Sequence, residues 1–398
     1  MKGCVTMPYF LDDAYKIKEE LISNRRILHQ VPEVGDDLPQ TTAFVMKKLM
    51  EMGIVPQEIC KSGITATIGG EKGGKVFLLR ADMDALSMEE DSGLEFSSIN
   101  GYAHTCGHDI HTAILLGAAK ILKQYEQDLD GTVKLMFQPN EENMAGAAAM
   151  LKAGILENPK VDAAVALHVF PGNMQVGMMY WGTGSILASS DVFRITVTGR
   201  GGHGAIPQKN IDPIYAAVQI YNALQEILTR EIDPQEPVVI TIGSFHAGDA
   251  PNIIPQTAVM TGSIRTFSNE VRVIAKKRLE EIATSTAKVF RADCSVEYIG
   301  EIPPTVNNIP LTLNLKKYID ELGIQIIPFP KQMGSEDFAL IAEAIPSVFL
   351  GIGAGGVDPQ YHQGGSHNPK VIFNEDVLPL GAATLAFIAY HWLKNQRQ

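Results

Sequence analysis

The sequence predicts an α/β protein whose main domain is a mostly parallel sheet with helices on both faces, interrupted by a smaller α+β domain. In the first and last parts of the chain, short apolar runs alternate with helical patterns, as in proteins built from strand–helix–strand units. Between about residues 187 and 303 the order changes to strand, helix, strand, strand, helix, strand. This βαββαβ order, which is ferredoxin-like, indicates a four-stranded antiparallel sheet with two helices on one side.

The main domain is expected to begin with two helices, at 12–29 and 41–52, which end near Pro32 and Gly53. Short apolar runs bounded by turn residues predict its buried strands, at Lys75–Ala81, Thr132–Gln138, Val161–His168 and Ser347–Ile352. Further helices are expected at His111–Tyr125 and Met144–Lys152, and a final one in the apolar stretch Val377–Leu393. That stretch is shorter than the ~20 apolar residues that span a bilayer, so it predicts a buried helix.

The inserted domain is expected between residues 187 and 303, which leaves 1–186 and 304–398 for the main domain. Its predicted strands are Val192–Thr198, Val238–Phe245, Ala258–Thr266 and Cys294–Ile299. Its predicted helices are Pro213–Arg230, with Asp212 as N-cap, and 268–290.

Composition excludes some classes of partner. The 398 residues suffice for two domains, and 33 basic against 45 acidic residues give a net charge of −12. This argues against binding to nucleic acid or to an anionic membrane, both of which need basic patches. Four cysteines without paired spacing (Cys4, Cys60, Cys106 and Cys294) do not indicate a disulfide framework. The first ten residues lack the apolar core of a signal peptide, so we expect a cytoplasmic protein.

The segment His104–His111 (HTCGHDIH) places thiolate, imidazole and carboxylate groups within eight residues. Such donors suit a transition metal such as zinc. Three other interpretations stay open for the segment alone. Its histidines could cap the helix that follows, Cys106 could be a nucleophile activated by a histidine, or Cys106 could be a small buried hydrophobe.

Polar side chains also follow three predicted strands, in Arg80–Asp84 (RADMD), Gln138–Glu142 (QPNEE) and Leu167–His168. Ligands of open α/β sheets gather beyond the carboxyl ends of the strands, so these side chains are expected at one rim. Solvated loops would explain polar residues in any one of these segments. They explain poorly why polar residues follow all three strands. Of the adjacent Glu141 and Glu142, one could bind a metal while the other takes a proton from a metal-bound water.

With these motifs, the sequence resembles the metal-dependent amidohydrolases that include hippurate hydrolases, bacterial N-acyl-amino-acid deacylases and plant auxin-conjugate hydrolases, relatives of the zinc aminoacylases and glutamate carboxypeptidases. The resemblance covers nearly the whole chain. The matching segments are RRILH (25–29) with Pro32 and Glu33, RADMDAL (80–86), HTCGHDIHT (104–112), FQPNEE (137–142), GRGGHGAIP (199–207), APNIIP (250–255), MGSEDF (333–338) and HNP (367–369). Three positions depart from the usual pattern: Asn140, Ser87 and Gln208 stand where alanine, proline and histidine are common.

The resemblance implies two divalent ions per subunit, of zinc, manganese, nickel or cobalt. Cys106 would bridge them, with His108 and His168 on one ion and Glu142 and His367 on the other. Glu141 would be the general base and acid, and Asp84 would orient a metal-binding histidine. In the inserted domain, which would act as a lid or dimerisation domain, His203 would stabilise the oxyanion in the site of a partner subunit, and Asn252 and Arg265 would hold a substrate carboxylate.

The function expected is hydrolysis of the amide bond of small N-acyl amino acids, such as acetyl or benzoyl derivatives, by a homodimer or possible tetramer. Dipeptide or N-acyl-diaminopimelate cleavage is the alternative within the same family. A hydrolase that uses Cys106 as nucleophile is a more distant one, because it leaves Glu141, Glu142, His168 and His367 without a role. A non-catalytic binding protein would require a damaged base or ligand, and none is visible.

Overall fold

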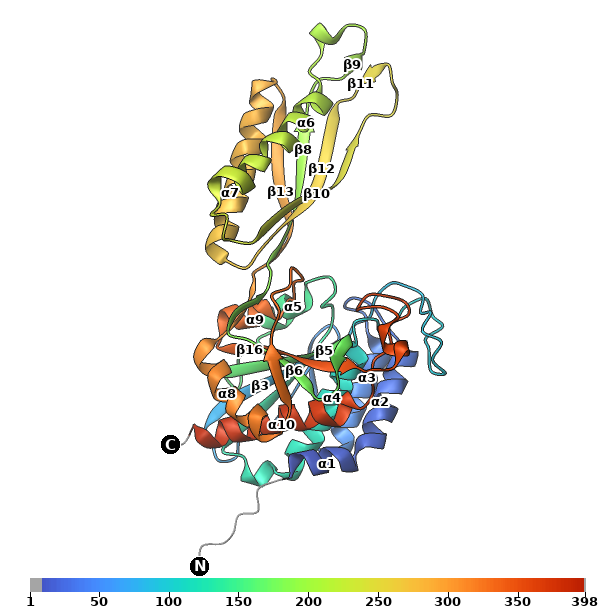
Figure 1. Cartoon of the computed structure of the whole chain (residues 1–398), viewed down its shortest axis with the longest axis vertical. Coiled ribbons are helices and arrows are strands. Elements are labelled where there is room, and N and C mark those ends of the chain that lie inside the picture. The colour runs from blue at the N-terminus through green and yellow to red at the C-terminus, as the bar shows by residue number, and fades with distance from the viewer. Residues whose placement is uncertain (1–8, 397–398) are drawn as a thin grey trace, which may run out of the picture. The chain divides into compact units, whose positions relative to one another are not determined.

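The computed structural model describes residues 9–396, which form two compact units (Figure 1). The first comprises the chain up to Gly184, Val306–Pro330 and the chain from Leu340 onward; the second comprises Ser185–Thr305 and Lys331–Ala339. The expected domain boundaries lie within two residues of these, except that 331–339 was expected in the main domain. Cys4 and most of the N-terminal segment used to predict location lie outside the described residues.

The first unit is built on an eight-stranded sheet of order β1-β2-β4-β3-β5-β16-β6-β15. The central pairs β3–β4, β3–β5 and β5–β16 are parallel, as is β6–β15. β1–β2, β2–β4 and β6–β16 are antiparallel. The strands are β1 (Gln57–Cys60), β2 (Gly63–Gly69), β3 (Lys75–Asp82), β4 (Gly131–Gln138), β5 (Ala163–Gln175), β6 (Met178–Trp181), β15 (Gln325–Pro328) and β16 (Ser347–Gly355). The predicted parallel-rich α/β fold is confirmed.

Helices cover both faces of this sheet. They are α1 (Phe10–Lys16), α2 (Lys18–Gln30), α3 (Pro39–Glu51), α4 (His108–Gln124), α5 (Gly146–Lys152), α8 (Ile309–Glu321), α9 (Ala339–Ala344) and α10 (Val377–Asn395), with short 3-10 turns η1 (Glu126–Asp128) and η4 (Pro359–His362). The helix expected at 12–29 is wrong in one respect: it is interrupted at Ile17, which separates α1 from α2. The helix expected from His111 begins three residues earlier, so that His108 lies in its first turn.

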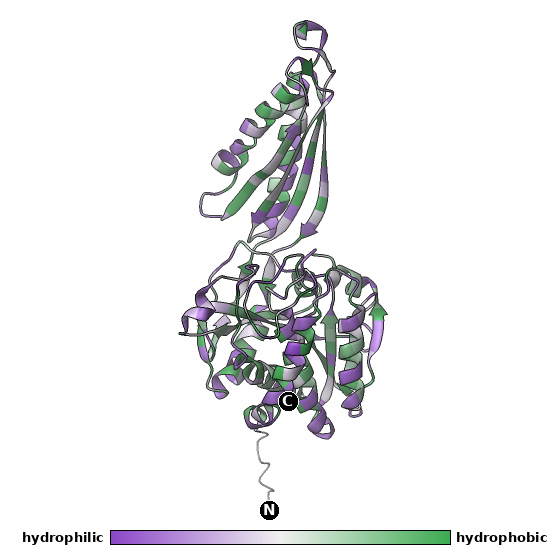
Figure 2. Cartoon of the chain, turned by 90° about the vertical axis from the view of Figure 1, so that its right-hand side faces the viewer, coloured by the Kyte–Doolittle hydropathy of each residue, from purple (hydrophilic) through white to green (hydrophobic). Residues whose placement is uncertain are grey.

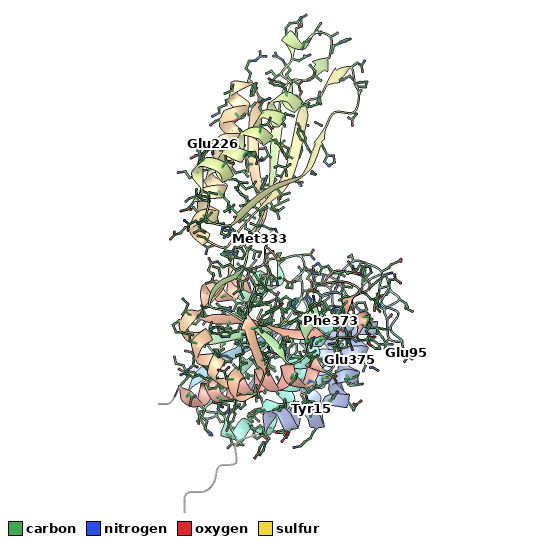
Figure 3. The ribbon with its side chains drawn as sticks, in the orientation of Figure 1. Tyr15, Glu95, Glu226, Met333, Phe373 and Glu375 are labelled. Atoms are coloured by element: carbon green, nitrogen blue, oxygen red, sulfur yellow. The ribbon has the colours of Figure 1, made fainter. Side chains whose placement is uncertain are left out.

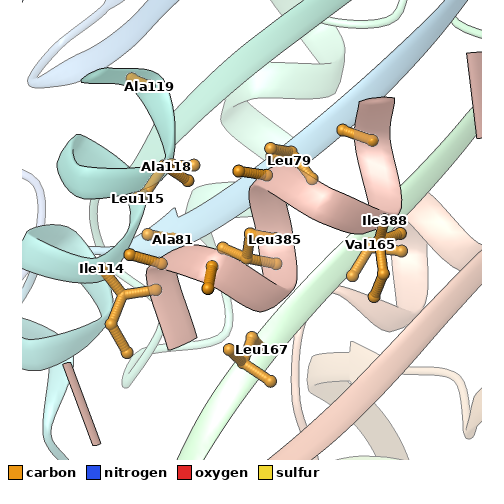
Figure 4. Packing of buried hydrophobic residues seen from close by; sticks show 14 of the residues in the cluster. Leu79, Ala81, Ile114, Leu115, Ala118, Ala119, Val165, Leu167, Leu385 and Ile388 are labelled. Carbon is orange, nitrogen blue, oxygen red and sulfur yellow. The ribbon is translucent and has the colours of Figure 1, made fainter. Parts of the chain in front are cut away.

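The main core lies between the sheet and the helices α4 and α10, which pack side by side (Figure 4). Leu79 and Val165 of the strands meet Ile114 of α4 and Leu385 of α10, and all four are almost completely buried. Burying a side chain of this size contributes about 1.5–3 kcal/mol. α10 is long and apolar enough to cross a bilayer, but 83% of its apolar window is buried inside the fold. The expectation of a buried terminal helix is therefore met.

The second face of the sheet is more polar. Residues of β4 alternate between faces, so Lys134 and Met136 point away from Val133, Leu135 and Phe137 of the main core. Lys134 donates hydrogen bonds to the carbonyls of Glu157 and Pro159, at 2.6 and 3.4 Å, which places the segment after α5 on this face. On β5, the same alternation puts His168 and Phe170 on the second face, because Val165, Leu167 and Val169 belong to the main core.

The second unit has the predicted βαββαβ order, with the sheet order β10-β12-β8-β13 and every pair antiparallel. Its elements are β8 (Ser190–Thr198), β9 (Gly202–His203), η2 (Pro207–Lys209), α6 (Pro213–Ala223), η3 (Ile227–Glu231), β10 (Val238–Ala247), β11 (Ile253–Ile254), β12 (Thr257–Thr266), α7 (Asn269–Val289) and β13 (Asp293–Ile302). Short strands β7 (Gly184–Leu187) and β14 (Thr305–Asn307) lie where the chain passes between units.

The helices of the second unit are amphipathic, with alternating green and purple segments in Figure 2. α6 begins as predicted, because the Asp212 carboxylate accepts the backbone N–H of Ile214 and Tyr215 at 2.9 and 3.3 Å. The helix ends at Ala223, earlier than the predicted Arg230, and a short π-helical turn, η3, occupies Ile227–Glu231 instead.

Candidate metal centre

Polar side chains converge at the carboxyl ends of β3 and β4 and at His168 within β5. Asp82 is the last residue of β3, Glu141 and Glu142 follow β4, and His168 lies on β5 just beyond its pairing with β3. Asp82 and Glu141 are 0% and 6% exposed. Buried carboxylates are costly unless they are paired, hydrogen-bonded or bound to a cation, so this rim is organised around positive charge.

Cys106 and His108 reach the same rim from the start of α4. Gly107 between them is the N-cap and has φ +90°, a conformation that glycine adopts without strain. A Cβ at this position would lie 2.5 Å from Cγ2 of Val169, so there is also no space for a side chain. The glycine therefore allows the chain to turn sharply into the helix with Cys106 and His108 both directed into the rim.

Two groups of potential metal ligands lie side by side and share Cys106. One consists of Cys106, His108 and His168, and the other of Cys106, Glu142 and His367. Within each group the donor atoms lie within 4.8 Å of one another. Cys106 Sγ is 3.4 Å from Nε2 of His168, and Nε2 of His367 is 3.3 Å from Oε1 of Glu142. The structure thus brings together the five residues that the resemblance suggested as ligands.

Hydrogen bonds fix Nδ1 of both His108 and His168 and so orient the two rings. Nδ1 of His108 donates to the backbone carbonyl of Asp84 at 2.8 Å, and Nδ1 of His168 donates to the carbonyl of Val169 at 2.8 Å. Nε2 is therefore the nitrogen that each ring directs at the cluster, and without a proton it can bind a metal ion. Nε2 of His108 is buried without a direct hydrogen bond, and the buried Oε1 of Glu142 lies 3.8 Å from it and 3.3 Å from Nε2 of His367. Nitrogen and carboxylate atoms gathered in this way fit a bound divalent cation.

The electrostatics of the cluster also fit a cation. Although burial lowers it, the pKa of His108 is raised well above its ordinary range, chiefly by the carboxylate of Asp82, so this position attracts positive charge. Burial and the neighbouring His111 hold the pKa of His168 well below its ordinary range, which keeps its imidazole neutral. Burial raises the pKa of Cys106 to about 12. A bound cation stabilises a thiolate, whereas burial alone leaves a protonated and weakly reactive thiol.

Asp84 holds the two glutamates in place. Its carboxylate accepts the backbone N–H of Glu141 at 3.0 Å and that of Glu142 at 3.1 Å, while its carbonyl accepts from His108. Glu141 Oε2 lies 4.0 Å from Nε2 of His108. Asp84 was expected to orient a metal-binding histidine. Its contacts indicate that its carboxylate also positions both glutamates.

His367 comes from a loop near the C-terminus and has φ +64°, in the left-handed region. Its backbone N–H donates to the carbonyl of Thr105 at 3.0 Å, which ties this loop to the residue before Cys106. A non-glycine residue in this conformation is uncommon and often lies at a functional site. The strained backbone directs the imidazole toward Glu142.

Three further residues support the cluster and were not assigned roles from the sequence. Asp82 accepts hydrogen bonds from Arg80 at 2.7 Å and from Nδ1 of His111 at 2.6 Å. Nε2 of His111 accepts the N–H of Val169 at 2.9 Å, so both nitrogens of His111 are occupied, although it lies close enough to Asp82 and His108 to be a ligand. The sequence did offer a signal for these roles, because a strand predicted to be buried carries charged residues at two alternate positions, Arg80 and Asp82.

The remaining predicted residues lie in the second unit. His203 on β9 is exposed and pairs with Ile253 of β11, and the N–H of Gly204 donates to the carbonyl of Asn252 at 2.8 Å, so His203 and Asn252 are neighbours. Arg265 lies near the far end of β12, where its Nη1 donates to the carbonyl of Met333 at 2.9 Å and to Ser335 at 3.3 Å. The structure therefore groups His203 with Asn252 and not with Arg265.

The chain is similar to known proteins over most of its length. Residues 78–391 match the model of Peptidase family M20/M25/M40. An IAA-amino acid hydrolase (ILR1-like 4) of Arabidopsis thaliana is 38% identical over 94% of this chain and 86% of its own. An N-acetyl-L-cysteine deacetylase of Bacillus subtilis is 38% identical over 87% of this chain and 83% of its own. The crystal structure of a dinuclear metal-binding M20 peptidase of Bacillus subtilis aligns with this chain at a TM-score of 0.83 and 32% sequence identity. The alignment covers 96% of this chain and 99% of the Bacillus chain.

Proposed function

This chain belongs to Peptidase family M20/M25/M40 and is a hydrolase of amide bonds, and we propose that it uses two divalent ions to cleave N-acyl amino acids. The products would be a carboxylate and a free amino acid. The observation that carries the proposal is the pair of ligand groups that share Cys106, with Glu141 beside them. His108 and His168 would hold one ion, Glu142 and His367 the other, and Cys106 would bridge both.

Glu141 is the proposed catalytic base. When bound, a pair of divalent ions polarises the amide carbonyl and lowers the pKa of water from about 15.7 toward about 7. The carboxylate of Glu141, fixed through its backbone by Asp84, would take the proton of the attacking water. It would then return that proton to the nitrogen of the leaving amine, since an amide nitrogen leaves readily only after protonation.

The donor set narrows the identity of the metal. One thiolate, three imidazoles and one carboxylate favour zinc, nickel or cobalt, and manganese is also compatible with oxygen and nitrogen ligands. Cysteine as the nucleophile has less support, because burial raises the pKa of Cys106 to about 12 and little thiolate would form without a cation.

Aromatic side chains beside His168 favour a flat apolar acyl group. The half-buried ring of Phe170 lies 5.2 Å from the His168 ring and 5.3 Å from the half-buried ring of Tyr180. Gly351, which pairs with His168, leaves room for Phe170, whose ring would meet a Cβ there at 2.6 Å. We therefore expect benzoyl derivatives to be cleaved with higher kcat/KM than acetyl derivatives.

The test is a panel of substrates with and without metal. Chelator should abolish hydrolysis of N-benzoyl and N-acetyl amino acids, and added divalent metal should restore it. Glu141→Gln should bind metal normally but lose turnover, because an amide cannot take the proton. Full activity of metal-free protein would refute the proposal. Preference for a dipeptide or for an N-acyl-diaminopimelate would keep the mechanism and change the substrate.

We further propose a cytoplasmic homodimer formed through the second unit, with His203 acting in the site of the partner subunit and Asn252 and Arg265 holding the substrate carboxylate. Ile214, Val218 and Tyr221 form an apolar stripe on α6 and are 37%, 39% and 43% exposed, which supports an interface there. A mixture of inactive His203→Ala and inactive Glu141→Ala chains should regain part of the activity. Subunit exchange without any regain would contradict this arrangement.

A further inference from the structure

The proposed function leaves the buried Arg25 without a role. Arg25 of α2 is 1% exposed and is among the largest fully buried side chains in the described part of the chain. It belongs to the segment Arg25–His29, which contains none of the proposed metal ligands or catalytic residues. Burying a guanidinium is costly unless its N–H groups are paired, so its partners indicate what the residue is for.

The Arg25 guanidinium contacts three separate segments. Nε donates to Oδ2 of Asp109 at 2.7 Å, in the first turn of α4, and Nη1 donates to Oε1 of Glu375 at 3.4 Å. The guanidinium carbon lies 4.7 Å from the centre of the Phe96 ring. Figure 3 shows Glu375 beside α2, and Glu375 follows His367 by eight residues in the chain.

His29 holds the same carboxylate from the next turn of α2. Nδ1 of His29 lies 2.8 Å from Oδ2 of Asp109, and Nε2 lies 3.0 Å from Oε1 of Glu90. Both carboxylates accept, so His29 donates to each when it is protonated, and Nη2 of Arg25 lies 3.3 Å from the same Nδ1. With Arg26, which binds Glu375 from outside, three positive side chains face the three carboxylates of Asp109, Glu90 and Glu375. The network is balanced in charge although most of it is buried.

The consequence for the site comes through the chain itself. Asp109 directly follows His108, and both lie in the first turn of α4. Holding the Asp109 carboxylate limits rotation of that turn about the helix axis, and such rotation would move Nε2 of His108 relative to Cys106 and His168. We propose that Arg25 is a positioning residue for the metal centre, which fixes the first turn of α4 by holding Asp109.

The geometry requires arginine. A guanidinium has donors that point in several directions in one plane, so it can reach Asp109 and Glu375 at once and still stack on Phe96. A lysine has a single ammonium group and cannot keep all three contacts. Arg26 provides a natural comparison, because it binds the same Glu375 and stacks on the same Phe96 at 4.6 Å but is 47% exposed.

The test measures metal binding directly and rests on the proposed function only through the ligand set. Metal-free Arg25→Lys, Arg26→Lys and unchanged protein are titrated with Co²⁺, and the thiolate-to-cobalt absorption band reports binding at Cys106. We expect Arg25→Lys to bind Co²⁺ about 10- to 100-fold more weakly, the range for loss of groups that orient metal ligands. Arg26→Lys, an exposed change, should stay within about twofold. Excess Co²⁺ should restore the band in Arg25→Lys.

The outcomes separate the two proposals. If the unchanged protein shows no thiolate-to-cobalt band, the metal centre itself is refuted. If it shows the band and Arg25→Lys binds Co²⁺ equally well, the positioning role is refuted, and so it is if Arg26→Lys weakens binding as much. Should Arg25→Lys fail to fold, His29→Gln removes the second donor to Asp109. Folded His29→Gln with unchanged Co²⁺ affinity would then overturn the inference.

Discussion

Replacing Asp84 with asparagine changes one oxygen of a side chain that is 1% exposed and leaves its shape almost unaltered. The two carboxylate oxygens accept the N–H groups of Glu141 and Glu142 at 3.0 and 3.1 Å. An amide keeps one acceptor and turns a donor toward the other N–H. The variant therefore loses one hydrogen bond, leaves a buried N–H unpaired, and removes the charge from the remaining bond.

The size of the effect follows from these losses. A buried unpaired N–H costs about 1–3 kcal/mol, and a neutral acceptor in place of a charged one loses about 1 kcal/mol more. The sum is about 2–4 kcal/mol. If all of it appears as misplacement of Glu141 in the transition state, kcat falls about 30- to 900-fold, at 1.36 kcal/mol for each factor of ten.

The assay is kcat on an N-benzoyl amino acid at saturating metal, with urea unfolding measured in parallel. Asp162→Asn is a matched control, because Asp162 also accepts a backbone N–H, that of Val76 at 2.8 Å, at the opposite end of β3. It should lose stability but keep kcat. An unchanged kcat in Asp84→Asn would refute the positioning of Glu141 by Asp84. Activity that is lost at limiting metal but normal at saturating metal would show that Asp84 acts on metal affinity instead.

Two further predictions concern residues that support the site. Gly107→Ala should destabilise the metal-free protein by about 2–5 kcal/mol in urea unfolding, from left-handed strain of about 1–2 kcal/mol and overpacking of about 1–3 kcal/mol against Val169; unfolding like that of the unchanged protein would contradict it. Burial and the neighbouring Arg25 lower the pKa of His29, but Asp109 and Glu90 raise it above its ordinary 6.5. Burial raises the pKa of Glu90, but His29 and Ser92 lower it from 4.5 to about 2. The stabilisation from His29 is full below pH 6.5 and lost as pH rises through its higher folded value, while that from Glu90 is full above pH 4.5 and lost as pH falls toward 2. The stability lost in His29→Gln should thus be greatest between pH 4.5 and pH 6.5 and should decrease at higher pH. A loss of stability that does not depend on pH would argue against the network.

The local patterns of the sequence were sufficient for much of the fold. Apolar runs of seven or eight residues predicted β3, β4 and the start of β5, and the βαββαβ order of the second unit followed from alternation and helix signals. Short or edge strands were missed, among them β1, β6 and β15, because four residues carry too little periodicity to distinguish a strand from a loop. The break at Ile17 was missed for a related reason, since residues on both sides of it have helical patterns.

The sequence by itself determined which residues are available for chemistry, because ligand types and strand ends are local properties. Tertiary structure decided how they are used. Which face of the sheet carries His168, how His367 is turned by a strained loop toward Glu142, and why Arg25 is buried against Asp109 all depend on contacts between segments up to 350 residues apart. Such contacts are set by packing and strand register over the whole unit. They cannot be inferred from the residues that are adjacent to each position in the sequence.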